Sequence, residues 1–168
     1  LFPVAFLAAK ATLAALKLTN HEGGTLPGFI AETIDPAFLG DIAKPEQVVF
    51  ITGTNGKTTT TKIVVELLES VGMKVFTNRT GSNFSRGVAA ALLNEVDIHG
   101  KLDADIAVLE LDEAWAVKFV KMVQPRFSLL LNVMRDQLDR FGEIDTTAKL
   151  LEKIAAATID TVVLNRDD

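Results

Sequence analysis

The stretch Val49-Phe50-Ile51-Thr52-Gly53-Thr54-Asn55-Gly56-Lys57-Thr58-Thr59-Thr60 decides the fold of this chain. An apolar run at residues 48–51 stops at a turn that is bounded by Gly53 and Gly56. Apolar residues then recur at helical spacing, at Val64, Leu67, Leu68 and Val71. The pattern predicts a strand, a tight loop and a helix.

The residues of this loop are typical of a phosphate site. Gly53 and Gly56 let backbone N–H groups approach an anion without a Cβ in the way, and the helix start adds unpaired donors and a partial positive charge. Lys57 can reach the β- and γ-phosphates, and the Thr58 hydroxyl suits Mg²⁺. Because Ile51 stands where the common pattern has its first glycine, this is the shorter G-x-x-G-K-T form of the P-loop. A plain glycine N-cap is the alternative, but it does not explain the lysine and hydroxyls.

Composition indicates a globular protein. The 168 residues suit one domain, with 48% hydrophobic and 23% charged residues. A net charge of −5 argues against a general nucleic-acid binder, although it permits a local anion site. The sequence contains no cysteine, which excludes disulfides and thiolate metal sites within it.

Residues 1–19 are apolar and rich in alanine, interrupted only by Lys10 and Lys17. A signal peptide would carry positive charge ahead of the apolar run, and a spanning helix would need about 20 apolar residues without Lys10 in the middle. We expect a helix packed on the domain, with a helix on a membrane surface as the alternative. The chain begins without methionine, so we expect it to be trimmed at this end.

The next residues contain turn signals. Residues 20–28 predict a loop, and Asp35 with Pro36 predicts the start of a short helix that runs to Ile42. We therefore divide the chain into an N-terminal helical segment and loop, residues 1–45, and a nucleotide-binding part, residues 46–168.

Beyond the loop, predicted strands and helices alternate, and Gly72 is predicted to cap the first helix. Strands are predicted at residues 74–77, 106–111, 127–131 and 161–164, and helices at 88–93, 113–123 and 145–158. This alternation predicts an α/β fold, a mostly parallel sheet with helices on both faces.

In such a sheet, ligands bind beyond the carboxyl ends of the strands. Glu110 ends a strand of core residues, and a buried carboxylate needs a cation. Mg²⁺ shared with Thr58 would supply it, while a salt bridge or a solvent-facing edge position is the alternative. Asp112 and Glu113 follow, and Glu113 is expected to begin the next helix.

Two further loops carry polar residues at strand ends. Residues 132–142 hold alternating charges, including Asp136 and Asp139, which fit either a solvated loop or the wall of an active site. Asn78 and Asn83 follow another strand, and both ligand contact and hydrogen bonds within the loop remain open for them.

Together, residues 53–59, Glu110 and residues 132–140 resemble the ATP-binding central domain of the Mur ligases, which are ATP-dependent amide-forming enzymes. Within this superfamily, residues 23–28, 77–83, 110–114 and 135–142 are similar to the MurT-type synthetase subunits of lipid II isoglutaminyl synthase. The resemblance covers nearly the whole chain.

The resemblance implies ATP-dependent amidation of the D-glutamate α-carboxyl of lipid II, through an acyl phosphate, with ammonia from a GatD-type glutaminase. Lys57 would neutralise the transferring phosphoryl group, and Thr58 and Glu110 would hold Mg²⁺. The phosphates would be lined by Gly53, Thr54, Asn55 and Gly56, with Thr59 flanking them. The resemblance also implies a cytoplasmic protein, at the inner face of the membrane if the first helix contacts lipid.

The resemblance has limits. Amino-acid-adding Mur ligases have a histidine where this chain has Gln137, which puts a second Mg²⁺ in doubt. They also use a carbamylated lysine, for which neither Lys149 nor Lys153 has a convincing spacing. The family continues into a zinc insertion and a C-terminal domain beyond this incomplete central domain, so we expect the chain alone to be inactive. The alternatives are a ligase that adds an amino acid to a UDP-linked precursor and an ATP-binding module without turnover.

Overall fold

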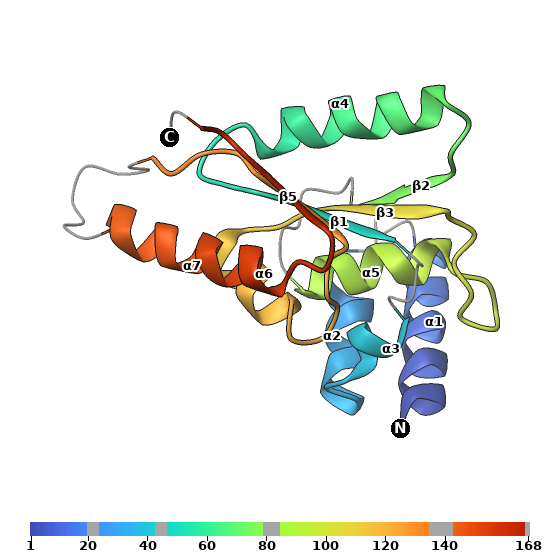
Figure 1. Cartoon of the computed structure of the whole chain (residues 1–168). Helices are drawn as coiled ribbons and strands as arrows, with labels where there is room; N and C mark the ends of the chain where they lie inside the picture. The colour runs from blue at the N-terminus through green and yellow to red at the C-terminus, as the bar shows by residue number, and fades with distance from the viewer. Residues whose placement is uncertain (20–23, 43–46, 79–84, 135–142, 167–168) are drawn as a thin grey trace. The chain divides into compact units, whose positions relative to one another are not determined.

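The computed structural model describes residues 1–19, 24–42, 47–78, 85–134 and 143–166. These residues form two compact units (Figure 1). The first contains residues 1–45 and 78–103, and the second contains residues 46–77 and 104–168. The sequence places a boundary at residue 45, but residues 78–103 join the first unit rather than the second.

The second unit is built on a single sheet of five strands. The strands are β1 (Val48–Thr52), β2 (Val75–Thr77), β3 (Ile106–Glu110), β4 (Phe127–Leu130) and β5 (Thr161–Leu164). Their order is β2-β3-β1-β4-β5, and every neighbouring pair is parallel. Ile51 of β1 stands opposite Glu110 on one side and Leu129 on the other. The carboxyl ends of β1, β3 and β4 therefore lie side by side.

Helices cover both faces of this sheet, which confirms the predicted α/β fold. Figure 1 shows α4 (Lys57–Ser70) on one face, and α6 (Glu113–Phe119) and α7 (Glu143–Ala157) on the other. The predicted extension of α6 to Val123 is wrong, since hydrogen-bonded turns follow Phe119. The i→i−3 bond from Lys121 N to the Lys118 carbonyl tightens the last turn and ends the regular helix there.

The core explains why β1 and β3 are apolar up to their last residues, Thr52 and Glu110. All five residues of each strand are buried. Val49 and Ile51 pack with Val65 of α4, whereas the Phe50 ring meets Phe119 of α6 edge to face, with centroids 5.5 Å apart. Because successive side chains alternate between two covered faces, both sets must be apolar. This burial fixes the strand that leads into the glycine-bounded loop.

The first unit consists of helices: α1 (Phe2–Leu18), α2 (Leu26–Ile34), α3 (Phe38–Ile42) and α5 (Ser85–Glu95). The Phe2 ring stacks on Phe6 and Phe38, with centroids 5.8 and 5.2 Å away. Lys10 Nζ donates a hydrogen bond to the Val96 carbonyl at 2.7 Å, beyond the end of α5. Burial, with a smaller contribution from Lys17, lowers the pKa of Lys10.

Two predictions in this unit are wrong. Residues 26–28, expected in a loop, begin α2, because Pro27 suits a first helical turn. A Cβ on Gly28 would overlap the backbone oxygen of Arg86, so this glycine permits close packing of α2 on α5. Asp35 ends α2 and accepts a hydrogen bond from Ala37 N, so the next helix begins at Phe38 and not at Pro36.

The predicted N-terminal helix is confirmed as α1. Within the part of the chain that the structure describes, no helix has the length and apolar character needed to cross a membrane.

Candidate phosphate-binding site

The loop between β1 and α4 depends on two glycines in left-handed backbone conformations. Gly53 has φ +139° and Gly56 has φ +83°. A Cβ on Gly53 would lie 3.0 Å from the backbone nitrogen of Asn132, so a larger residue would press on that backbone and would also be strained at this φ. Gly56 is the N-cap of α4 and, as a glycine, brings no side-chain cap of its own, and among the described residues none is seen to cap this helix end. The first-turn N–H groups of α4 are therefore available to an anion.

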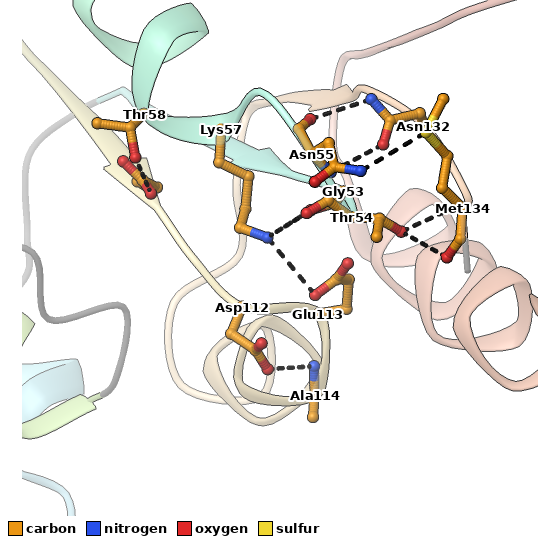
Figure 2. A network of polar contacts seen from close by, with 11 residues as sticks. Gly53, Thr54, Asn55, Lys57, Thr58, Asp112, Glu113, Ala114, Asn132 and Met134 are labelled. Atoms are coloured by element: carbon orange, nitrogen blue, oxygen red, sulfur yellow. Dashed lines mark hydrogen bonds and ion pairs between the residues drawn. The ribbon is translucent and has the colours of Figure 1, made fainter. Parts of the chain in front are cut away.

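A reciprocal pair of hydrogen bonds holds the loop against the end of β4. Asn55 N donates to Asn132 Oδ1 at 2.9 Å, and Asn132 Nδ2 donates to the Asn55 carbonyl at 3.0 Å (Figure 2). Thr54 N adds a bond to the Asn132 carbonyl at 3.1 Å. The Asn132 side chain thus pairs with both the backbone N–H and the backbone carbonyl of Asn55. These bonds hold the shape of the loop without a bound ligand.

The Thr54 side chain makes a second connection to the residues after β4. Its Oγ1 accepts a hydrogen bond from Met134 N at 3.0 Å and lies 3.3 Å from the Met134 carbonyl, to which it donates. Its hydroxyl is therefore committed to the protein. We infer that Thr54 contributes backbone rather than its side chain to a phosphate site.

Lys57 folds back over the loop. Its Nζ donates to the carbonyl oxygens of Gly53 and Thr54, at 2.5 and 3.2 Å, and lies 4.0 Å from a carboxylate oxygen of Glu113. The side chain is 16% exposed. The ammonium group is thus held at the mouth of the loop by carbonyl dipoles and one carboxylate, within a short movement of an anion bound there.

Thr58 and Glu110 meet at the start of α4. Thr58 Oγ1 donates to Glu110 Oε1 at 2.8 Å, and Glu110 is only 9% exposed. The contact confirms the predicted proximity of these two residues. A carboxylate and a hydroxyl at this spacing are hard oxygen donors, which suit Mg²⁺ when phosphate oxygens and water complete its coordination. The described residues contain no group of three His, Cys, Asp or Glu side chains that would form a metal site alone.

Glu113 begins α6, as predicted from its position after a strand. Asp112 is the N-cap of that helix, and its side chain accepts a hydrogen bond from Ala114 N at 3.1 Å. This cap explains why Glu113 stands in the first helical turn, where Figure 2 shows it facing Lys57. Sequence reasoning missed this contact, because no spacing rule links residues on two different loops.

The structure describes some of the remaining candidate residues that the sequence suggests, and the others lie outside the described residues. Thr59 is exposed on α4, and Asn78 is buried directly after β2. Lys149 and Lys153 are exposed on α7, as expected for solvated lysines. The remaining candidates, Asn83, Asp136, Gln137 and Asp139, lie outside the described residues. The role of Asn132 was also missed, although its position at a strand end next to β1 was a usable signal.

The fold and this loop define a parallel α/β domain of the class that binds ligands at the carboxyl ends of its strands. The family model of the Mur ligase middle domain matches residues 51–168, and the chain therefore belongs to the Mur ligase middle-domain family.

Relatives with known names match much of the chain. It is 42% identical over 86% of its length to a protein of Streptococcus pneumoniae that is named lipid II isoglutaminyl synthase (glutamine-hydrolyzing) subunit MurT. A Staphylococcus aureus protein with the same name is 35% identical over 95% of the chain. The chain spans only 32% and 36% of those two proteins, about one third of their length.

Solved structures share the fold. The MurF ligase from Thermotoga maritima in complex with ADP has a TM-score of 0.68 and 25% identity, over 81% of this chain and 33% of that one. A MurF structure from Acinetobacter baumannii has a TM-score of 0.65 and 23% identity, over 82% of this chain and 30% of that one. The second match bears on the fold alone.

Proposed function

We propose that this chain is the ATP-binding part of an enzyme that amidates the D-glutamate α-carboxyl of lipid II to D-isoglutamine. The observation that carries the proposal is the contact between Thr58 Oγ1 and Glu110 Oε1, beside Lys57 and the start of α4, whose N-cap is Gly56. These groups unite an anion site with a pair of hard oxygen donors, which is what transfer of a γ-phosphoryl group requires.

In the proposed reaction, the substrate carboxylate attacks the γ-phosphorus of ATP and ADP leaves, which gives an acyl phosphate. Ammonia then attacks the acyl carbon, phosphate leaves with the C–O electron pair, and loss of a proton gives the amide. The backbone from Gly53 to Gly56 would line the phosphates, with Thr59 flanking them, while Lys57 would stabilise the charge of the transferring group. Thr58 and Glu110 would hold Mg²⁺, whose contribution is to neutralise charge on the phosphate oxygens.

The names of the relatives favour amidation over other ligase reactions. The two isoglutaminyl synthase subunits match at 42% and 35% identity over most of the chain. A partner subunit that hydrolyses glutamine, of the GatD type, would supply the ammonia. The proposed lipid substrate implies a cytoplasmic protein that works at the inner face of the membrane.

A second candidate is a ligase that adds an amino acid to a UDP-linked precursor. It is favoured by relatives named UDP-N-acetylmuramoylalanine–D-glutamate ligase, such as that of Natranaerobius thermophilus, which is 31% identical over 76% of the chain. The third candidate is an ATP-binding module without turnover. It is considered because this chain spans only 32% and 36% of the length of the two isoglutaminyl synthase subunits.

The product of the natural polypeptide that carries this chain separates the three candidates. We expect mass spectrometry to detect conversion of a carboxyl to an amide in lipid II, when ATP, Mg²⁺, glutamine and a glutaminase subunit are supplied. A peptide lengthened by one amino acid would instead support the second candidate, and no product would support the third. The 168-residue chain alone is expected to give no product.

A further inference from the structure

One face of α1 is apolar and exposed along its whole length. Large side chains on it include Val4, Leu7 and Leu18, which are 61%, 68% and 88% exposed. Ala11 and Ala14 lie between Leu7 and Leu18 at three- and four-residue spacing, Pro3 precedes Val4, and all three are exposed. The opposite face, with Ala5, Phe6, Ala9 and Leu13, is buried in the first unit. An apolar surface on both sides of a helix is unusual in a helix at a protein surface.

The charge of α1 differs from that of the protein. Residues 1–19 contain two lysines and no aspartate or glutamate, whereas the whole chain has a net charge of −5. Lys17 is exposed in the last turn of the helix, near Leu18. Lys10 is held by the Val96 carbonyl, so Lys17 is the lysine of this helix that points to solvent. The helix is therefore positively charged within an acidic protein.

We propose that the exposed face of α1 docks on the surface of a bilayer that contains anionic lipids. The exposed apolar side chains would enter the boundary between headgroups and acyl chains, and Lys17, at the edge of this face, would contact anionic headgroups. Since no helix among the described residues is long and apolar enough to cross a membrane, the proposal is for surface docking and not for insertion across the bilayer. The proposal concerns the first unit and does not depend on the reaction proposed above.

Vesicle binding tests the proposal. The purified chain is sedimented with vesicles of phosphatidylglycerol and phosphatidylcholine, and with vesicles of phosphatidylcholine alone. We expect binding to the anionic vesicles, weakened about tenfold by Leu7→Glu because a charge would have to enter the apolar boundary of the bilayer. The matched control is Leu67→Glu on α4, where the replaced leucine is 62% exposed, close to the 68% of Leu7. This control should bind as the unchanged protein does.

A separate variant tests how much the charge of Lys17 contributes to vesicle binding. Lys17→Gln should weaken binding to anionic vesicles about fivefold. It should not change binding to vesicles of phosphatidylcholine alone. Circular dichroism spectra and the midpoint of thermal unfolding establish that each variant is folded. The three substituted positions are exposed, so we expect no loss of structure.

Three results would overturn the proposal. The first is an absence of binding to anionic vesicles by the unchanged protein. The second is equal weakening by Leu7→Glu and Leu67→Glu, which would reflect added charge rather than this face. The third is a dimer in analytical ultracentrifugation that Leu7→Glu dissociates, because the face would then belong to a second copy.

Discussion

Thr58 Oγ1 donates a hydrogen bond to Glu110 Oε1 at 2.8 Å across 52 positions of sequence. The contact joins the first turn of α4 to the end of β3, next to the loop that follows β1. It exists because β1 and β3 are parallel neighbours with Ile51 opposite Glu110. The register of β1 and β3 thus determines that the Glu110 carboxylate meets the hydroxyl of Thr58, the residue that follows Lys57.

If this pair holds Mg²⁺, Glu110→Gln should remove the dependence of ATP affinity on Mg²⁺. We expect Mg²⁺ to strengthen ATP binding about tenfold in the unchanged protein, within the usual range for coupled sites, and hardly at all in the variant. Thr58→Ala should resemble Glu110→Gln, and Thr58→Ser, which keeps the hydroxyl, should restore the dependence. Calorimetric titrations with and without a chelator provide the measurement, and an unchanged Mg²⁺ dependence in Glu110→Gln would refute the metal assignment.

Asn132 should be needed for the shape of the loop. Asn132→Ala removes two hydrogen bonds to Asn55, and we expect a lower free energy of unfolding, by about 1–3 kcal/mol, together with weaker ATP binding. Urea unfolding and titration measure the two effects. Asn94→Ala is the control, since that side chain donates to Ala90 O within α5 and should leave ATP affinity unchanged. Equal ATP affinity in both variants would mean that the loop keeps its shape without Asn132.

Gly53→Ala should lower both stability and ATP affinity, whereas Gly72→Ala should lower stability alone. The alanine would be strained at φ +139° and would press on the backbone of Asn132, a cost of about 1–3 kcal/mol or more. Gly72→Ala is the matched control, because Gly72 has φ +90° but no atom within 4 Å of the Cβ that an alanine would add. We expect both variants to lose stability and only Gly53→Ala to lose ATP binding, as measured by urea unfolding and titration.

Glu113 should compete with phosphate for Lys57, because its carboxylate lies 4.0 Å from Lys57 Nζ. Removing its charge by Glu113→Gln should strengthen ATP binding about threefold, the size expected for a single ion pair at a partly exposed site. The control is Glu66→Gln, which removes one negative charge from the exposed side of α4, at a distance from Lys57. This variant should leave ATP affinity unchanged. Weaker ATP binding in Glu113→Gln would instead indicate that the carboxylate positions Lys57 for the phosphate.

Much of the second unit could be predicted from the sequence, because its signals are local or follow one topological rule. The apolar runs at 48–51 and 106–109 predict buried parallel strands, and the glycines predict the turn between β1 and α4. The proximity of Thr58 and Glu110 followed from the rule that carboxyl ends of parallel strands meet at one edge.

The features that sequence analysis missed depend on tertiary contacts. Gly28 has the appearance of a turn glycine, yet it serves the close packing of α2 on α5. The amide pair between Asn55 and Asn132 and the contact between Lys57 and Glu113 join loops from different strands. Only the strand order β3-β1-β4 brings these loops together, and no local pattern specifies that order.

The central claim is that the loop from Gly53 to Thr58 grips the phosphates of ATP. Its most direct test is a calorimetric titration of the chain with ATP in the presence of Mg²⁺, beside the same titration of Lys57→Ala. We predict saturable binding at one site, weakened at least about tenfold by the loss of a charge that contacts phosphate directly. Equal affinity in the two proteins, or no binding by a folded unchanged chain, would contradict the claim.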